Sequence, residues 1–185
     1  LSRGGKKMKT DKTLPGILLG ISLLLFGAVT AHAGEEQPDA YVMTVYSDAA
    51  HGSKIIDGAP KDVIAKLSSK DGARSNALAG QVNLCVAYTK TMQLEKAAEI
   101  CDSAIAAALK DARRLERSGI FGRQTTQVAD TGRAIALTNR GVLHAVTGEK
   151  AKARLMFEMA LMLKSKEESA RTNLLFLDRE TAKDS

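Results

Sequence analysis

Apolar residues recur at intervals of three and four along most of the chain, and short polar or glycine-containing breaks separate the runs. The stripe at Val63, Ile64 and Leu67, which follows a turn at 57–60, is one example. Residues three and four apart share one face of a helix, so the pattern predicts amphipathic helices and an all-α fold. Helices are predicted at 75–90, 94–117, 131–146, after the turn at 147–149 as far as 163, and at 167–180.

Two stretches of the chain carry small residues at the same intervals. In the first, Cys85 is followed by Ala97, Cys101 and Ala104; in the second, Gly141 is followed by Ala153, Phe157 and Ala160. The axes of two helices approach closely only where the facing side chains are small, and a larger residue there costs about 1–3 kcal/mol. The intervals therefore predict two helix pairs whose close contacts lie at these positions.

This pattern resembles the tetratricopeptide repeat (TPR), a helix–turn–helix unit of about 34 residues. The resemblance implies a short array of antiparallel helix pairs, stacked as a right-handed superhelix, with a C-terminal capping helix. Gly58 precedes Met92 by one such repeat length, which extends the register to a degenerate first repeat. Cys85 and Gly141 are further apart than one repeat length, so an insertion of about 22 residues separates the two full repeats.

The register divides the chain into seven parts. They are an N-terminal extension and signal peptide at 1–33, a flexible or extended segment at 34–46, a degenerate repeat at 47–69, a TPR-like repeat with an extended second helix at 75–118, a linker at 119–130, a second TPR-like repeat at 131–164 and a capping helix at 167–180. The degenerate repeat is expected to begin with a helix near 47–56. In the capping helix, Leu174, Leu175 and Leu177 are expected to pack on the last repeat.

The N-terminal region has the layout of a secretory signal peptide. The stretch from Leu14 to Val29 is apolar except for Ser22, and an Ala-x-Ala sequence ends at Ala33. This layout predicts export with cleavage after Ala33, most simply to the periplasm of a Gram-negative bacterium. Contact with the membrane is then expected only through the transient signal peptide. The alternative is an uncleaved N-terminal anchor, although the apolar run is shorter than the roughly 20 residues of a bilayer span.

The resemblance also implies where a partner binds. In the TPR family, partner contacts lie on the concave face, which is formed by the first helix of each pair. The corresponding residues here are Ala79, Val82, Val86, Thr89, Ile135, Thr138, Val142 and Ala145. Since most of them are small and apolar, the face favours a helix or an extended peptide as its ligand. The alternatives are that the chain's own N-terminal segment or the insertion fills this face, or that a homodimer covers it.

Cys85 and Cys101 are the only cysteines, and both lie on the helices of one predicted pair. An oxidising compartment permits a disulfide between them, worth about 3 kcal/mol in the chain-entropy model. The alternative is a pair of buried thiols that serve as small core residues. His51 and His144 have no partners at ligand spacing, so no metal site is predicted. The sequence also lacks the motifs that predict a catalytic or cofactor site.

The net charge of +6 is concentrated at the N-terminus. Residues 1–33 hold five of the 27 basic residues and one of the 21 acidic ones, which leaves a net charge of +2 on the remainder. This balance gives little electrostatic support to nucleic-acid binding. A basic cluster at Arg113, Arg114 and Arg117, with Arg123 nearby, is interpreted either as a solvated helix end or as a docking patch for an anionic partner or membrane headgroups.

These observations predict a non-enzymatic, exported scaffold that binds a protein or peptide through its repeat helices, without a cofactor. Two alternatives remain. The chain could be a structural subunit whose repeats serve self-assembly as a homo-oligomer, or a small redox protein that uses its two cysteines.

Overall fold

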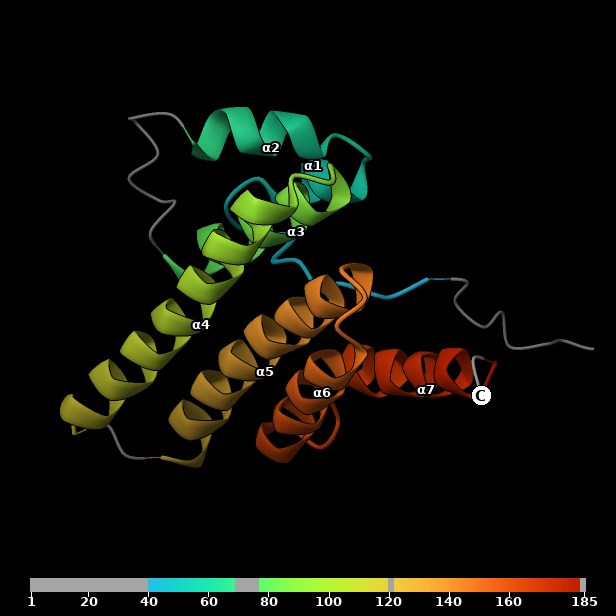
Figure 1. Cartoon of the computed structure of the whole chain (residues 1–185). Helices are drawn as coiled ribbons and strands as arrows, with labels where there is room; N and C mark the ends of the chain where they lie inside the picture. The colour runs from blue at the N-terminus through green and yellow to red at the C-terminus, as the bar shows by residue number, and fades with distance from the viewer. Residues whose placement is uncertain (1–39, 69–76, 120–121, 184–185) are drawn as a thin grey trace, which may run out of the picture. The chain divides into compact units, whose positions relative to one another are not determined.

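The computed structural model describes residues 40–68, 77–119 and 122–183. The predicted leader, with its cleavage site, lies outside these residues. Every regular element of the described part is an α-helix, so the prediction of an all-α fold is confirmed (Figure 1). The helices are α1 (Gly52–Ile56), α2 (Pro60–Leu67), α3 (Leu78–Lys90), α4 (Leu94–Arg117), α5 (Arg123–Val146), α6 (Lys150–Leu163) and α7 (Glu168–Lys183). None of these helices has the length and apolar character that a bilayer span requires.

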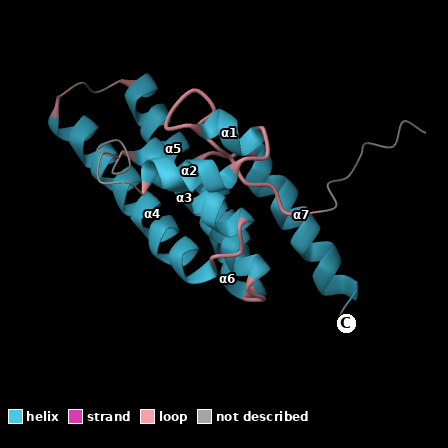
Figure 2. Cartoon of the chain, turned by 90° about the horizontal axis from the view of Figure 1, so that it is seen from above, coloured by secondary structure: helices cyan, strands magenta, loops and turns pink. Residues whose placement is uncertain are grey.

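The helices are arranged in two layers. Each helix contacts the next one along the chain, and the odd-numbered helices also contact one another in the order α1, α3, α5, α7. Within the described part, no two even-numbered helices are in contact. The odd-numbered helices therefore lie side by side in one layer, and the even-numbered helices pack behind them. Figure 2 shows the same helices from above.

Three of the helix–helix connections have the same turn. Gly58, Met92 and Gly148 have positive φ angles of 81°, 57° and 79°. In each turn, the N–H of the following residue donates to the carbonyl oxygen five residues earlier, at 2.7, 3.0 and 2.8 Å. This pattern satisfies carbonyl groups left open at the end of the preceding helix. The first two turns are one repeat length apart, and the insertion separates the second from the third, so the turns follow the register that the sequence predicts.

Small residues lie at the helix contacts. Cys85, Ala97 and Cys101 are fully buried, and a disulfide joins the two cysteines across α3 and α4, with their Cα atoms 4.8 Å apart. Between α5 and α6, a Cβ atom added to Gly141 would lie 2.5 Å from the ring of Phe157. Only glycine fits there without a shift of the ring, because real Cβ contacts are longer than this.

The predicted linker at 119–130 is wrong from residue 123 onward, because α5 begins at Arg123. The helices α4 and α5 each have 24 residues, whereas α3 has 13 and α6 has 14, so the insertion lengthens two neighbouring helices (Figure 1). The sequence from 123 to 131 contains neither Gly nor Pro. Thr125 also closes the first turn, since its Oγ1 donates to the carbonyl of Gly122 at 2.7 Å and accepts the N–H of the same residue at 3.2 Å.

Two further expectations differ from the structure. The first helix begins at Gly52 rather than near Ser47, because Ala50 and His51 have positive φ angles that no helix contains. In α7, Leu177 is buried and Leu174 is partly buried, but Leu175 is 53% exposed. Successive helical residues are about 100° apart, and the buried face of α7 is centred near Leu177, so Leu175 lies on the solvent side.

Candidate functional site

A non-helical segment at residues 41–46, here called the N-terminal segment, lies across the layer of odd-numbered helices. It is coloured blue in Figure 1 and precedes α1. Its backbone forms hydrogen bonds with α7, α5 and α3 in turn, so the segment runs from the last of these helices towards the first. Of the part at 34–46 that the sequence predicts to be flexible or extended, the structure describes residues 40–46, and hydrogen bonds to three helices hold residues 42–46 in place.

Three asparagines bind the backbone of every second residue of the N-terminal segment. The pairs are Asn173 with Val42, Asn139 with Thr44, and Asn83 with Tyr46. In each pair, the asparagine Oδ1 accepts the backbone N–H, at 2.7, 2.9 and 2.9 Å respectively. The Nδ2 donates to the carbonyl oxygen of the same residue, at 2.8, 2.8 and 3.1 Å. All three asparagine side chains are fully buried.

Asparagine suits this task because its amide has a donor and an acceptor in one plane. An extended chain presents the N–H and C=O of alternate residues along the same edge, so one amide can satisfy both groups of one residue. Asn139 and Asn173 are one repeat length apart, and the insertion widens the interval between Asn83 and Asn139, as it does for the turns. Each of α3, α5 and α7 therefore carries one asparagine at an equivalent position.

The side chains of the segment alternate between two sides. Met43 and Val45 pack against the core cluster that contains Val86 and Leu143. The side chain of Thr44, between them, is directed away from this cluster and towards α7, where its hydroxyl lies 2.9 Å from the hydroxyl of Ser169. This alternation is that of an extended chain, in which successive side chains lie on opposite sides.

Tyr41 fixes the start of the segment. Its ring lies 4.8 Å from the ring of Phe176, in an edge-on arrangement, and 6.4 Å from the ring of Phe157. Its hydroxyl donates to Glu180 on α7. Burial, together with the hydrogen bond to Glu180 and the charge of that carboxylate, raises the pKa of Tyr41 above its usual value of 10. The neutral phenol is therefore the form that fits this position.

Tyr46 and the following turn fix the other end. Tyr46 packs against Val82 and Ile135, and its pKa is raised by burial and by the negative charges of Asp111 and Glu167. The amide of Asn83 also donates to the carbonyls of residues 49 and 50, at 2.9 and 3.2 Å. A Cβ atom at position 52 would lie 2.1 Å from the carbonyl oxygen of Tyr46, so glycine is required there.

The N-terminal segment packs over the face predicted to bind a partner. Six of the eight predicted residues are buried, namely Val82, Val86, Thr89, Ile135, Thr138 and Val142, whereas Ala79 and Ala145 are partly buried. The hydroxyls of Thr89 and Thr138 bond to carbonyls of their own helices, both at 2.8 Å. Of the alternatives left open by the sequence, the structure shows the one in which the chain's own N-terminal segment fills the face. Binding of a partner there stays a prediction.

Sequence reasoning misses Asn83 and Asn173 as functional candidates, and it places Asn139 outside the binding positions. One signal is present, since the three asparagines follow the same repeat register as the turns. Their role depends on a segment that is distant in sequence: the partner residues lie 37 residues from Asn83, 95 from Asn139 and 131 from Asn173. No local sequence pattern indicates these contacts.

The remaining charged candidates do not form a shared site. Arg113 and Arg117 line one shallow depression on α4, whereas Arg114 lines a different cleft with Leu115 and Val128. His144 is nearly buried, and its Nδ1 lies 2.6 Å from a carboxylate oxygen of Glu149.

Glu149 lies in the turn between α5 and α6. The hydrogen bonds from Lys152 and His144 lower the pKa of this glutamate to about 2. Among the described residues, no three His, Cys, Asp or Glu side chains are grouped closely enough to hold a metal ion.

Comparison with protein-family models, with curated proteins and with solved structures finds no match to this chain. The face of α3, α5 and α7 that carries Asn83, Asn139 and Asn173 and lies beneath the N-terminal segment is here called the groove. The geometry of the segment and the groove is the remaining guide to the function.

Replacing Asn139 with leucine tests the central asparagine. The substitution keeps the side-chain shape but removes both hydrogen bonds to Thr44, and a buried polar group left unpaired costs about 1–3 kcal/mol. We expect the free energy of unfolding, measured with urea, to fall by about 2 kcal/mol or more. Thr138→Val is the matched control on the same helix, because its hydroxyl bonds only within α5. A loss from N139L no larger than that from T138V would contradict the role given to Asn139.

The raised pKa of Tyr41 predicts a pH dependence. In the unfolded chain the phenol loses its proton near pH 10, whereas in the folded chain it keeps the proton to higher pH. The stability that Tyr41 contributes is therefore present below about pH 10 and declines as the pH rises above it. In urea unfolding between pH 8.5 and 11, wild type should lose stability more steeply than Tyr41→Phe. Parallel curves for the two proteins would refute this assignment.

Proposed function

We propose that this chain is a non-enzymatic scaffold of the TPR-like helical-repeat type that binds an extended segment of a partner protein. The observation that carries the proposal is the set of three buried asparagines, each bonded to both backbone groups of one residue of the N-terminal segment. Such a groove binds the backbone of its ligand, while apolar side chains at alternate positions supply additional contact. We also propose export to the periplasm by the predicted leader.

The repeat interpretation has support from two registers. The turns and the asparagines each recur once at the repeat length and once at the repeat length plus the insertion, and the small residues at helix contacts recur at the longer interval. The two-layer contact order is that of stacked helix pairs, in which each unit touches only its neighbours. In this interpretation α7 is the first helix of a fourth unit rather than a simple cap, since it carries an equivalent asparagine.

The N-terminal segment acts in this proposal as an internal ligand. A partner segment binds only by taking its place, because both would use the same asparagines. An attached segment has an effective concentration in the millimolar range, so a free ligand competes poorly until the internal one is weakened. Binding would consequently depend on conditions or partners that loosen residues 41–46.

The small redox protein is a weaker candidate. Cys85 and Cys101 are bonded to each other and fully buried, and a reactive cysteine needs at least partial exposure. Self-assembly remains compatible with the groove, since the N-terminal segment of a second copy would fit it equally well.

A synthetic peptide of residues 40–47 tests whether the groove accepts a separate segment. Thr44→Pro removes the N–H that donates to Asn139 and leaves every groove residue unchanged. We expect fluorescence anisotropy to show at least about tenfold tighter peptide binding to T44P than to wild type, because the internal ligand is weakened. Val42→Pro is a second, milder variant, as Val42 is at the exposed start of the segment.

The control peptide carries proline at the position of Thr44 and should not bind. Adding Asn139→Leu to T44P should abolish binding of the wild-type peptide. If T44P and V42P stay helical by circular dichroism and neither binds the peptide, the groove serves only its own segment and the proposed function fails. Sedimentation of wild type as a stable dimer, dissociated by T44P, would favour self-assembly.

A further inference from the structure

The N-terminal segment is bonded to the helices along one of its two backbone edges. The N–H and C=O groups of Val42, Thr44 and Tyr46 bond to the asparagines. In an extended chain, the backbone groups of successive residues point to opposite edges, so those of Met43 and Val45 point away from the asparagines and from their helices. Among the residues that the structure describes, none forms a hydrogen bond with the backbone N–H or C=O of Met43 or Val45.

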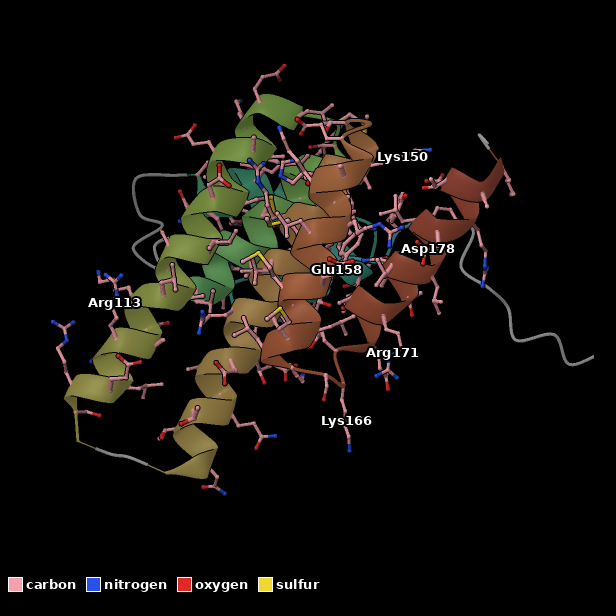
Figure 3. The ribbon with its side chains drawn as sticks, turned by 60° about the horizontal axis from the view of Figure 1, so that its bottom comes forward. Arg113, Lys150, Glu158, Lys166, Arg171 and Asp178 are labelled. Atoms are coloured by element: carbon pink, nitrogen blue, oxygen red, sulfur yellow. A yellow bond between two sulfur atoms is a disulfide. The ribbon has the colours of Figure 1, made fainter. Side chains whose placement is uncertain are left out.

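This second edge has the features of a strand edge that accepts another chain. Backbone groups without a protein partner need water or a further chain, and a row of them is a template for the addition of a strand. Proteins usually prevent such pairing with charged residues or proline on the edge. Charged side chains are plentiful on the helices, as Arg113 on α4, Glu158 on α6 and Asp178 on α7 illustrate (Figure 3). Residues 40–46, in contrast, contain no charged residue and no proline.

The side chains of the segment also favour a strand. Five of the six residues from Tyr41 to Tyr46 are β-branched or aromatic, which are the types enriched in strands. The asparagines bind backbone groups, so they do not by themselves select these types. Packing in the core does not explain Val42, which is exposed. A strand-forming composition beside an open edge is consistent with pairing to a second strand.

An apolar cleft of about 610 Å³ adjoins the first part of the segment. Residues 40–43 contribute to its lining, as do residues of α3, α5 and α7. The lining includes the exposed side chains of Met92 and Val146, and the ring of Phe176. Directly opposed residues of paired strands direct their side chains to the same face. Since Met43 lines the cleft, a residue paired with Met43 would direct its side chain to the cleft, which favours an apolar side chain there.

We propose that an uncharged, extended segment of a partner protein adds as an antiparallel strand to the open edge at Met43 and Val45, with apolar side chains in the adjoining cleft. Opposite each of these two residues, one partner residue donates its N–H and accepts another, as in any antiparallel pair. The asparagines keep their bonds to the N-terminal segment. The site is therefore distinct from the groove, in which a ligand takes the place of the segment, and either one can fail without the other.

A short synthetic peptide of alternating threonine and valine tests the open edge. Methyl groups on the threonine nitrogens leave only the valine edge free to pair, which also prevents the peptide from aggregating. We expect the peptide to slow amide exchange at Met43 and Val45 at least about tenfold, while the three amides bonded to asparagines stay slow. The control peptide has its methyl groups on the valine nitrogens, so that threonine side chains would face the cleft, and it should bind more weakly.

A charge in the cleft provides a second test with an intact segment. Val146 is 40% exposed, so Val146→Lys keeps the fold, and we expect it to weaken binding of the labelled peptide at least about fivefold in fluorescence anisotropy. Leu175→Lys is the matched control, because Leu175 is also exposed but does not line the cleft, and it should bind as wild type does.

The proposal is overturned if the peptide leaves exchange at Met43 and Val45 unchanged, or if V146K binds it as tightly as L175K. Faster exchange at the three amides bonded to asparagines would also overturn it, because the peptide would then replace the N-terminal segment. That last result would support binding in the groove, so the outcome separates the two sites.

Discussion

The double hydrogen bond between a buried asparagine and the backbone of one residue is the interaction on which the groove depends. It occurs three times, on α3, α5 and α7, and each occurrence satisfies a backbone N–H and a backbone C=O that would otherwise be unpaired. The interaction works in both directions. The asparagine amides would themselves be unsatisfied in the core without residues 41–46, and a buried polar group without a partner costs about 1–3 kcal/mol. The groove and its occupant therefore stabilise each other.

This mutual dependence links the two ends of the described chain. Residues 41–46 contact α7 first and α3 last, so a short segment connects helices that are far apart in sequence. In the described part, α3 and α7 do not contact each other, so the segment supplies a connection between them. The disulfide between α3 and α4 adds a second, local connection within one pair. The aromatic, hydroxyl and apolar side chains of the segment add contacts, but the backbone hydrogen bonds set its position.

The parts of the fold that depend on local pattern can be predicted from the sequence, and those that depend on distant contacts cannot. The helix class, the turns at Gly58, Met92 and Gly148, and the small residues at Cys85 and Gly141 all follow from spacing in the sequence. The start of α5 is missed because the glycines at 119 and 122 suggest a loop that continues past residue 122. In the structure, Gly122 directly precedes α5, and the lengthened α4 packs against that helix. The family resemblance predicts a binding face but leaves open what covers it. Residues 41–46 carry no local signal of where they dock, so only the structure shows that they cover this face.

Amide hydrogen exchange along residues 41–46, resolved by nuclear magnetic resonance, tests the central claim most directly. The account predicts slow exchange at Val42, Thr44 and Tyr46, whose N–H groups donate to buried asparagines, and faster exchange at Met43 and Val45, which bind none of the three. Uniformly fast exchange at all five amides would contradict the account, because it would mean that the asparagines do not hold this segment in solution.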